Sequence, residues 1–400
     1  LKKHVLKTPF KINLNILSFQ DFLPILNSVF VLARYFGISG FGLTLAFAWC
    51  LILFVMLVVT ECVAIWRVVT LKKSSENSLI GRLSGAIFYA NALMSLLLSS
   101  KFVHSWRKLS LYWLSMETNT ALDFPPDVKI KKRTIFITVF VASIAVVEHV
   151  LSMVNATGFN FPPEEFFHRY VTISHKFLIT KQDYNLWNAI PIFIVSKLAT
   201  ALWNFQDLII ILISMGLSSR YHRLNLYVSR VVTIEKRFEV KQRFGTETYL
   251  QIQVWRRLRE AYVRQSTLVR MVDRNLGSLL LLSNVNNLYF ICLQIYQGIH
   301  NSTGSTISHC YFLFSLSWLI FRACSVVLAA SDVHLHSQRA LKCLHSCPSA
   351  SYNIEMKRLQ YQLAHDFVAF KGMGFFSLRR ELLLEVSMTL RWMLQGSPRN

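Results

Sequence analysis

Long apolar runs alternate with basic and polar stretches along this chain. A helix needs about 20 mostly apolar residues to cross a bilayer. Six runs reach that length, and they are 42–66, 80–100, 134–154, 189–216, 276–298 and 309–331. A seventh run, 373–395, is interrupted by Glu381, Glu385 and Arg391. The pattern predicts an all-α polytopic membrane protein with six clear transmembrane helices and a weaker seventh.

The basic residues between the runs predict the side of the membrane on which each loop lies. The stretch 218–274 holds thirteen Lys and Arg and 101–133 holds seven, whereas 156–188 holds three and 299–308 holds none. Cytoplasmic loops carry the excess of Lys and Arg. We therefore expect a cytoplasmic N-terminus, with 101–133, 218–274 and 332–373 on the same side.

Two Asn-x-Ser/Thr sequons agree with this orientation. They begin at Asn155 and Asn301, and both lie in loops that we expect outside, where N-glycosylation occurs. A complete seventh span would then put the C-terminus outside as well.

Composition and charge exclude several classes of function. The 400 residues are 53% hydrophobic and 16% charged, whereas average soluble proteins carry roughly 25% charged residues. A net charge of +22 would suggest nucleic-acid binding in a soluble protein. Here the basic residues lie in loops beside spans, so topology accounts for them, and anionic lipid is the partner they would contact. We expect no nucleic-acid partner.

No motif predicts an enzyme or a bound cofactor. The sequence has no Gly-rich phosphate loop, no Ser-His-Asp context and no acid pair outside the spans. Seven scattered cysteines do not describe a disulfide framework. The His and Cys residues of 334–347 fit no tight zinc signature, so we read that stretch as a loop and expect no metal.

Polar side chains inside the apolar runs are the candidates for function, because ionisable groups in a span are costly and usually face the bundle interior. These side chains are Glu148, His149, Trp203, Asn204, Asp207, Asn284, Asn286, Asn287 and Gln294. Trp203 and Asp207 are four residues apart and should share one helix face. The alternative is that these groups pair with one another and hold the helices together.

Five stretches together carry a resemblance to a known family. They are SFQDFLPILNSVFVLARYFGISG (18–40), AVVEHVLSM (145–153), ALWNFQDLIIILISMGLSSRYHRLN (201–225), VWRRLREAYVRQSTLVRMVDRNLGSLLLLSNVNNLYFICLQIY (254–296) and GMGFFSLRRELLL (372–384). They resemble the segment before the first span, parts of the third, fourth and fifth spans, and the entrance to the last span of insect sugar gustatory receptors, the trehalose-receptor family.

The resemblance implies the insect chemoreceptor channel fold. Such a protein is a ligand-gated, non-selective cation channel, a tetramer of identical or related subunits in the plasma membrane of gustatory receptor neurons. It implies a cytoplasmic segment 1–41 and a six-helix ligand-binding domain 42–331, whose long cytoplasmic helices occupy 218–274. An anchor segment 332–372 and a pore helix 373–400 follow.

The resemblance also implies a sugar ligand. A sugar presents hydroxyl groups and weakly apolar C–H faces, so its site needs carboxylates, amides and aromatic rings. The ligand-binding candidates are Glu148, His149, Trp203, Asn204, Asp207, Asn287 and Gln294. We expect Glu148 and Asp207 to bind the polyol. Asp207 lies deep enough to be a packing or gating contact instead.

The pore candidates from the last span are Phe375, Phe376, Leu383, Val386 and Thr389. The resemblance fades after Val386, because Trp392-Met393 stands where the family has Thr-Tyr and Arg391 intrudes. We therefore hypothesise that residues from about 387 onward are not native pore sequence, and Leu1 in place of Met fits an imperfect record. Transcript sequencing across this junction tests the hypothesis.

Two other membrane classes compete with a sugar-gated channel. A G-protein-coupled seven-helix chemoreceptor would need the opposite orientation, with the N-terminus outside. A transporter would predict repeat symmetry or paired helices broken by Gly or Pro, and the sequence has neither. The sequence names neither the sugar nor the subunit composition.

Overall fold

The computed structural model describes residues 22–40, 45–70, 76–118, 122, 124–125, 127–158, 163–179, 182, 184–239, 246–300, 306–347 and 352–381. The described residues form helices joined by turns, with a single isolated β-bridge between Lys371 and Ser377 and no named strand. The all-α prediction is confirmed.

Six of the helices are long and apolar enough to cross a membrane. They are α3 (Leu45–Thr70), α4 (Glu76–Thr118), α5 (Ile130–Thr157), α7 (Leu186–Glu239), α8 (Thr246–His300) and α9 (Thr306–Gln338). Each contains one of the six runs predicted from hydrophobicity, apart from a few residues at the start of the first. Sequence therefore located the spans correctly, although the helices extend well beyond several of the apolar runs.

The remaining elements are short. They are α2 (Phe22–Ala33), the 3₁₀ helix η1 (Arg34–Phe36), α6 (Pro163–Ser174), α10 (Ala340–His345) and α11 (Ile354–His365). Sequence reasoning had assigned no structure to 22–33. The apolar face of α2 packs into the bundle, where Phe22 stacks on Trp113 and the indole of Trp106 donates a hydrogen bond to Asn27 (2.9 Å).

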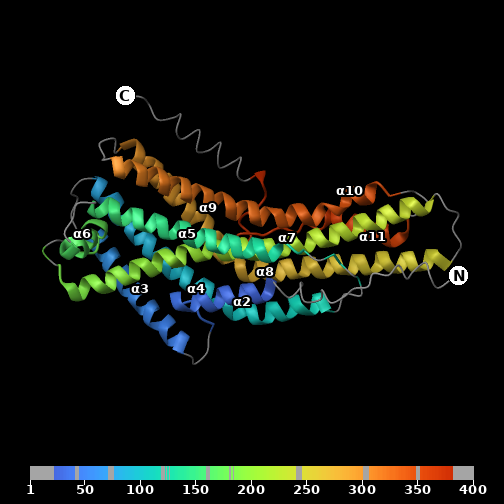
Figure 1. Cartoon of the computed structure of the whole chain (residues 1–400), viewed down its shortest axis with the longest axis horizontal. Helices are drawn as coiled ribbons and strands as arrows, with labels where there is room; N and C mark the ends of the chain where they lie inside the picture. Colours follow the sequence, from blue (N-terminus) through green and yellow to red (C-terminus); the bar gives the residue numbers. More distant parts are fainter. Residues whose placement is uncertain are drawn as a thin grey trace.

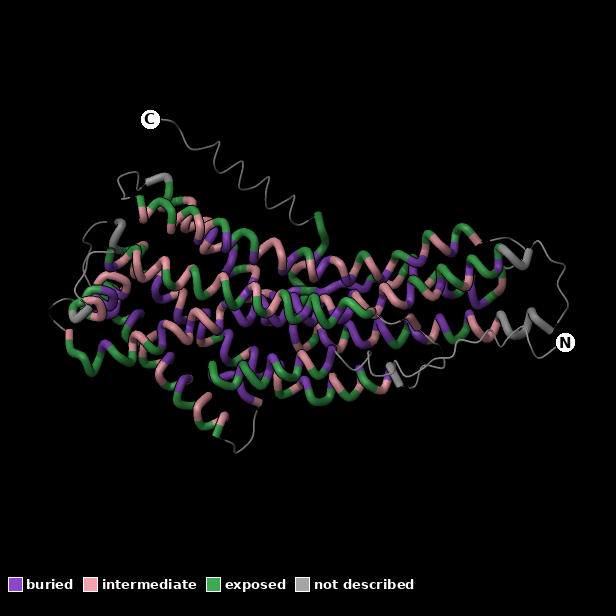
Figure 2. Tube along the Cα trace, in the orientation of Figure 1, coloured by how far each residue is buried: buried purple, intermediate pink, exposed green. Residues whose placement is uncertain are grey.

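The elements form an elongated bundle with α6 and the start of α9 at one end and α10 and α11 toward the other (Figure 1). Helix α7 runs through the middle and packs against α3, α4, α5, α8 and α9. In its most apolar window 72% of the residues are buried, whereas in α3 the share is 17%. The buried residues follow this central axis (Figure 2). Helix α3 is thus a peripheral helix with most of its surface left for lipid.

Two helices are longer than any bilayer requires. Helix α7 has 54 residues and α8 has 55, which corresponds to about 80 Å each at 1.5 Å per residue, against about 30 Å of hydrocarbon. Within the basic stretch 218–274, α7 continues as helix to Glu239 and α8 is helical from Thr246 onward. The predicted helical extensions are present, and their cytoplasmic location stays a prediction.

The helix ends that border the two loops expected outside lie at one end of the bundle. Helix α5 ends at Thr157 and α7 begins at Leu186, while α8 ends at His300 and α9 begins at Thr306. All four of these helix ends lie at the α6 end (Figure 1). This end is called the α6 end below, and the opposite one the α11 end.

The entrance to the last predicted span is not a helix. Residues 366–380 form a turn closed by the bridge between Lys371 and Ser377, and helical conformation resumes only at Glu381. The expected start of a span at 373 is therefore wrong. Met373 holds a positive φ of 53°, which a continuing α-helix would not allow. Leu383, Val386 and Thr389 lie outside the described residues.

The turn 366–380 packs tightly against α8. A Cβ atom at Gly277 would lie 2.9 Å from the carbonyl oxygen of Lys371, so only glycine permits this approach. The amide of Lys371 donates a hydrogen bond to the Asp273 carboxylate (2.8 Å). Phe375 is 78% exposed, whereas Phe376 packs partly against the core.

Candidate ligand site

A cavity of about 230 Å³ lies between α4, α5, α7, α8 and α9. Its polar lining side chains are Glu148, His149, Ser152, Thr200, Asn204, Gln294, Ser315 and Arg322. Its remaining walls are Phe88, Trp203, Phe290, Tyr311, Trp318 and Leu319. The cavity combines charged, amide and hydroxyl groups with several aromatic faces inside the helix bundle.

Helix periodicity explains how each helix presents its residues to this space. Thr200, Trp203 and Asn204 are three and four apart on α7, so they share one face. Tyr311, Ser315, Trp318, Leu319 and Arg322 follow the same spacing on α9. The contributing parts of α5 and α8 are close to the helix ends at Thr157 and His300. The cavity therefore lies in the half of the bundle nearer the α6 end.

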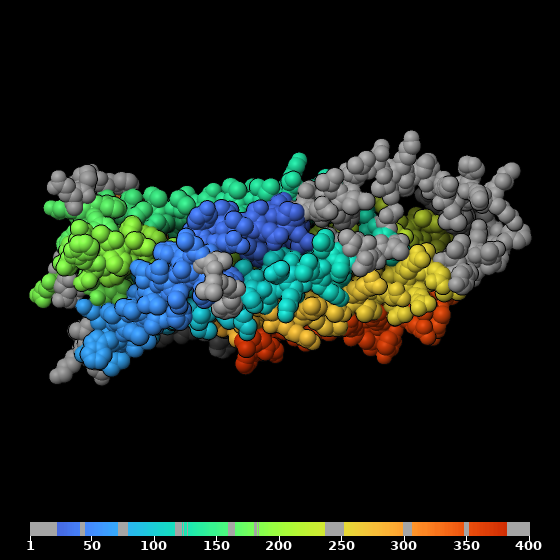
Figure 3. Space-filling view, turned by 90° about the horizontal axis from the view of Figure 1, so that it is seen from below, coloured from blue at the N-terminus to red at the C-terminus, as the bar shows by residue number. Residues whose placement is uncertain are grey.

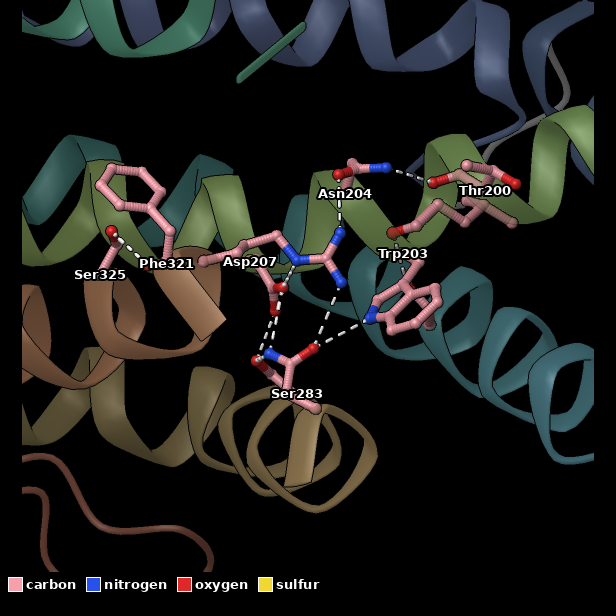
Figure 4. A network of polar contacts seen from close by, with 11 residues as sticks. Thr200, Trp203, Asn204, Asp207, Ser283, Phe321 and Ser325 are labelled. Carbon is pink, nitrogen blue, oxygen red and sulfur yellow. Dashed lines mark hydrogen bonds and ion pairs between the residues drawn. The ribbon is translucent and has the colours of Figure 1, made fainter. Parts of the chain in front are cut away.

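An ion pair between Asp207 and Arg322 lies at the buried side of the cavity. Nε of Arg322 is 2.6 Å from Oδ2 of Asp207, and the two side chains are 3% and 1% exposed. Ser283 and Asn287 also donate hydrogen bonds to the Asp207 carboxylate. Figure 4 shows Asp207 and Ser283 within this network of polar contacts, with dashed lines for its hydrogen bonds and ion pairs. Burying two charges is tolerable only when both are paired and hydrogen-bonded, and here both are.

The same arginine connects the ion pair to the cavity wall. Its two terminal nitrogens donate to Oδ1 of Asn204 (2.7 Å) and Oδ1 of Asn287 (3.3 Å). The guanidinium carbon lies 4.5 Å from the ring centroid of Trp203, a cation–π distance. The Trp203 indole donates to Oδ1 of Asn287 (3.1 Å). The orientation of Trp203 is thus fixed by two helices besides its own.

A second polar chain crosses the cavity from α8 to α5. Gln294 donates a hydrogen bond to the hydroxyl of Ser315 (3.2 Å), which donates to Oε1 of Glu148 (2.8 Å). Among the described residues, Oε1 of Gln294 and Nε2 of His149 are buried without a protein partner. Buried polar atoms are nearly always hydrogen-bonded, so these atoms are available to water or to a ligand.

A cluster with different chemistry lies next to the cavity on the α6 side. Nζ of Lys197 donates a hydrogen bond to the hydroxyl of Tyr170 (2.6 Å) and lies over the rings of Tyr170 and Phe193. Burial raises the pKa of Tyr170 to about 12. Burial, with a smaller contribution from Lys197, lowers the pKa of His175 to about 4. His175 is therefore neutral at physiological pH, and Lys197 is held in place by aromatic rings.

The structure divides the predicted ligand residues into two groups. Glu148, His149, Trp203, Asn204 and Gln294 line the cavity. Asp207 and Asn287 lie behind it, bound to Arg322. The expectation that Trp203 and Asp207 share a face is confirmed, since both contact Asn287.

Sequence reasoning missed Arg322 and the aromatic residues of α9. A signal was present, because an arginine inside the apolar run 309–331 is as costly in a membrane as Asp207. The pairing of Arg322 with Asp207 depends on how α7 and α9 pack, which no local pattern shows.

The structure describes only some of the remaining predicted sites, which are the two sequons and the His and Cys residues of 334–347. Asn155 is exposed in the last turn of α5, and Asn301 lies outside the described residues. His334 contacts the carbonyl of Val368 (2.9 Å), whereas His345 contacts Gln360 (3.0 Å). Within the described part of the chain, no three His, Cys, Asp or Glu residues are grouped as a metal site would require.

Comparison with known proteins matches this chain to a family model, to curated relatives and to solved structures. The family model for the trehalose receptor matches residues 25–392, which includes the first residues after Val386, where we expected the resemblance to fade. The Drosophila melanogaster gustatory receptor for sugar taste 64a is 30% identical over 321 residues, which are 76% of this chain and 66% of that protein. The gustatory receptor 5a for trehalose from the same species is 30% identical over 249 residues, 62% of this chain and 53% of that protein.

The chain thus spans between about half and two thirds of the length of these curated relatives. Among solved structures, the insect olfactory receptor OR5 from Machilis hrabei superposes with a TM-score of 0.68 at 11% sequence identity. The match covers 95% of this chain and 100% of that one. At this identity the likeness establishes a shared fold.

Proposed function

The chain belongs to the trehalose receptor family, and from this premise we propose that it is a sugar receptor acting as a subunit of a ligand-gated, non-selective cation channel. The names of its relatives refer to sugar taste and to trehalose. We place it in the plasma membrane of gustatory neurons, and its six membrane-length helices agree with a multi-pass protein. It has the character of a receptor rather than of an enzyme.

The cavity is the observation that carries the sugar proposal. A sugar hydroxyl both donates and accepts hydrogen bonds, and a ring C–H face packs on aromatic carbon. Glu148, His149 and Gln294 offer acceptors and donors, two of them with unpartnered atoms. Trp203 and Phe290, whose ring centroids are 4.7 Å apart, offer a continuous aromatic wall. A volume of about 230 Å³ is below the roughly 300–1,000 Å³ of drug-sized sites, which favours a small ligand.

The ion pair has a different role in this proposal. Asp207 is fully buried and already accepts hydrogen bonds from three side chains, so it has little capacity left for a ligand. We propose that Asp207 positions Arg322, which in turn holds Asn204 and Trp203 at the cavity wall. Asp207 and Asn287 are then positioning residues, whereas Glu148, His149, Trp203, Asn204 and Gln294 contact the sugar.

The channel part of the proposal is supported by the fold shared with an insect olfactory receptor. We propose a homo- or hetero-tetramer of related subunits, with Phe375 and Phe376 at the entrance to the pore and Leu383, Val386 and Thr389 along it. The competing class, a G-protein-coupled receptor, would need an extracellular N-terminus. Labelling of an N-terminal tag in intact cells would contradict the channel orientation.

Conductance in oocytes without added G protein tests the whole proposal. Currents should follow application of disaccharides, glucose, fructose or polyols to the wild-type chain. Glu148→Gln retains the shape of the side chain and removes its charge, so it should raise the half-maximal sugar concentration by about tenfold, equivalent to about 1.4 kcal/mol. Glu61 is a carboxylate in α3 that does not line the cavity. Glu61→Gln is therefore the matched control and should leave the response unchanged.

Binding must be measured separately, because loss of current alone does not separate a failed pore from a failed site. Sugar should raise the thermal unfolding temperature of purified wild-type protein in detergent, since a ligand that binds only the folded state stabilises it. Equal thermal shifts for wild type and Glu148→Gln, at equal surface expression, would contradict the assignment of the cavity. Binding without current would contradict the channel part alone.

A further inference from the structure

A second recess lies beside α3 on the membrane-facing side of the bundle. Its lining is mostly apolar, whereas the sugar cavity has many polar side chains. It has a volume of about 460 Å³ and lies between α3, the segment after α6 and the first turns of α7. Its α3 wall is formed by Val55, Met56, Val59, Thr60, Val63 and Arg67. Its floor and opposite wall include Leu178, Ile179 and Val195, which are 3%, 5% and 1% exposed. These buried walls make it a recess rather than an open lipid-facing surface.

The α3 wall runs along the helix axis. Val55, Val59, Val63 and Arg67 are each four residues apart, so they form one stripe. Twelve residues at 1.5 Å per residue extend about 18 Å, close to the roughly 15 Å that is half of the hydrocarbon thickness. The recess is therefore about as deep as one leaflet of a bilayer. Figure 3 shows that α3 lies on the outer surface of the molecule, where lipid reaches it.

The polar residues of the recess gather at its α6 end. Arg67 is close to the end of α3, and Asn188 is close to the start of α7. Each is preceded by an exposed tryptophan: Trp66 is 69% and Trp187 is 83% exposed. Exposed tryptophans near helix ends mark the level of the lipid headgroups. The opening of the recess thus lies at the membrane interface, with a cation beside it.

We propose that this recess binds one acyl chain of a bilayer phospholipid and that Arg67 contacts the phosphate of the same molecule. The apolar stripe matches the chain, and the guanidinium pairs with phosphate through charge-assisted hydrogen bonds. Asn188 lies at the depth of the ester carbonyls and donates to one of them. The lipid connects α3 to α7, the helix that also carries Trp203 and Asp207.

A sugar is a poor occupant of the same space. The hydroxyl of Thr60 already donates to the carbonyl of Met56 (2.8 Å), and the lining below it is aliphatic. Polar hydroxyl groups buried there would lose their hydrogen bonds to water without gaining new ones. The proposal holds whichever ligand the inner cavity takes.

Native mass spectrometry of the purified full chain tests the proposal with phosphatidylcholine as the probe. Wild-type protein should retain one phospholipid per chain after mild delipidation. Val59→Trp fills the recess and should abolish retention, whereas Ile52→Trp, on an exposed face of α3 outside the recess, should not. Arg67→Ala should lower occupancy by about fivefold, equivalent to roughly 1 kcal/mol per basic residue, and Arg67→Lys should restore most of it. Equal retention in Val59→Trp and Ile52→Trp would overturn the proposal.

A second measurement needs no substitution and so does not depend on a variant folding. Phosphatidylcholine with a diazirine in its acyl chain is added to the wild-type protein and photolysed. We expect crosslinks to concentrate on 55–63 and 188–195. Crosslinks spread equally over the lipid-facing residues of α3 and α5 would mean ordinary annular lipid and would overturn the proposal.

Discussion

The two halves of the bundle use similar polar residues for opposite purposes. At the α6 end, polar side chains surround a cavity of about 230 Å³. Toward the α11 end, the recess beside Tyr221, Tyr262 and Asp366 measures about 10 Å³, close to the least that holds one water. One half keeps room for a ligand, and the other half is packed.

Hydrogen bonds join the helices in both halves, and each half also holds buried polar atoms without a protein partner among the described residues, such as the hydroxyl of Tyr221 in the α11 half. In the α11 half, Tyr262 donates to Asn225, which donates to the carbonyl of His336, so α7, α8 and α9 are connected. Arg259 of α8 binds Glu355 of α11 (2.8 Å). In the cavity half, His149 and Gln294 keep buried atoms without a protein partner among the described residues. The halves therefore differ in the space beside such atoms: His149 and Gln294 line a cavity of about 230 Å³, whereas Tyr221 lines a recess of about 10 Å³.

The largest effect should come from the buried ion pair of Asp207 and Arg322 in the cavity half. Arg322→Ala leaves Asp207 buried without its cation, and breaking such a pair costs about 3–5 kcal/mol. The thermal unfolding temperature in detergent and the level of surface expression should both fall sharply. The double variant Arg322→Met with Asp207→Leu should recover much of the stability, because apolar residues tolerate burial, but not the sugar response. Full sugar response in the double variant would contradict the positioning role.

A smaller loss of stability should follow when a buried group in the packed half loses its hydrogen-bond partner. Tyr262→Phe removes the hydroxyl that donates to Asn225 (2.7 Å) and leaves a buried acceptor, at a cost of about 1–3 kcal/mol. The half-maximal sugar concentration should not change. Tyr361 is 66% exposed on α11, so Tyr361→Phe is the control. It should alter neither the stability nor the half-maximal sugar concentration. A sugar response that shifts in Tyr262→Phe would show that the two halves are coupled.

Acid should loosen the packed half by a modest amount. Hydrogen bonds from Arg259 and Arg358 hold the pKa of Glu355 below its usual value. Because the folded-state pKa is the lower one, the stabilisation is present above the usual pKa of 4.5 and is lost as pH falls below it toward the folded value. Wild type should lose more thermal stability than Glu355→Gln between pH 6 and pH 4, as measured by thermal unfolding in detergent. If the thermal stabilities of wild type and Glu355→Gln fell equally with pH, this account would be contradicted.

The smallest change in stability should accompany a large change in ligand response at the cavity. Gln294→Met keeps the shape of the side chain and removes its polar atoms, while Ser315 retains Glu148 as a partner. We expect a stability loss of at most about 1 kcal/mol and a tenfold or greater rise in half-maximal sugar concentration. Thermal unfolding and dose–response currents measure the two quantities. A stability loss comparable to that of Arg322→Ala would remove the distinction between the halves.

Sequence reasoning succeeded where one local property decides the outcome. Six spans follow from the length of their apolar runs, and Trp203 and Asp207 share a face because they are four residues apart. It failed at the entrance to the last span, where an apolar composition suggested a helix from 373. The bridge between Lys371 and Ser377 and the hydrogen bond from the Lys371 amide to Asp273 favour a turn there, and Asp273 is 98 residues away in the chain.

The sequence by itself determined the fold class, the positions of the spans and the family, because hydrophobic length and the quoted motifs are local and additive. Tertiary structure alone decided that Arg322 neutralises Asp207, that Glu148 and Gln294 meet through Ser315, and that Asp207 lies behind the cavity instead of lining it. Each of these contacts joins two different helices, and Glu148 and Ser315 are 167 residues apart. Their meeting depends on the rotation and offset with which whole helices pack, and no single stretch of sequence carries that information.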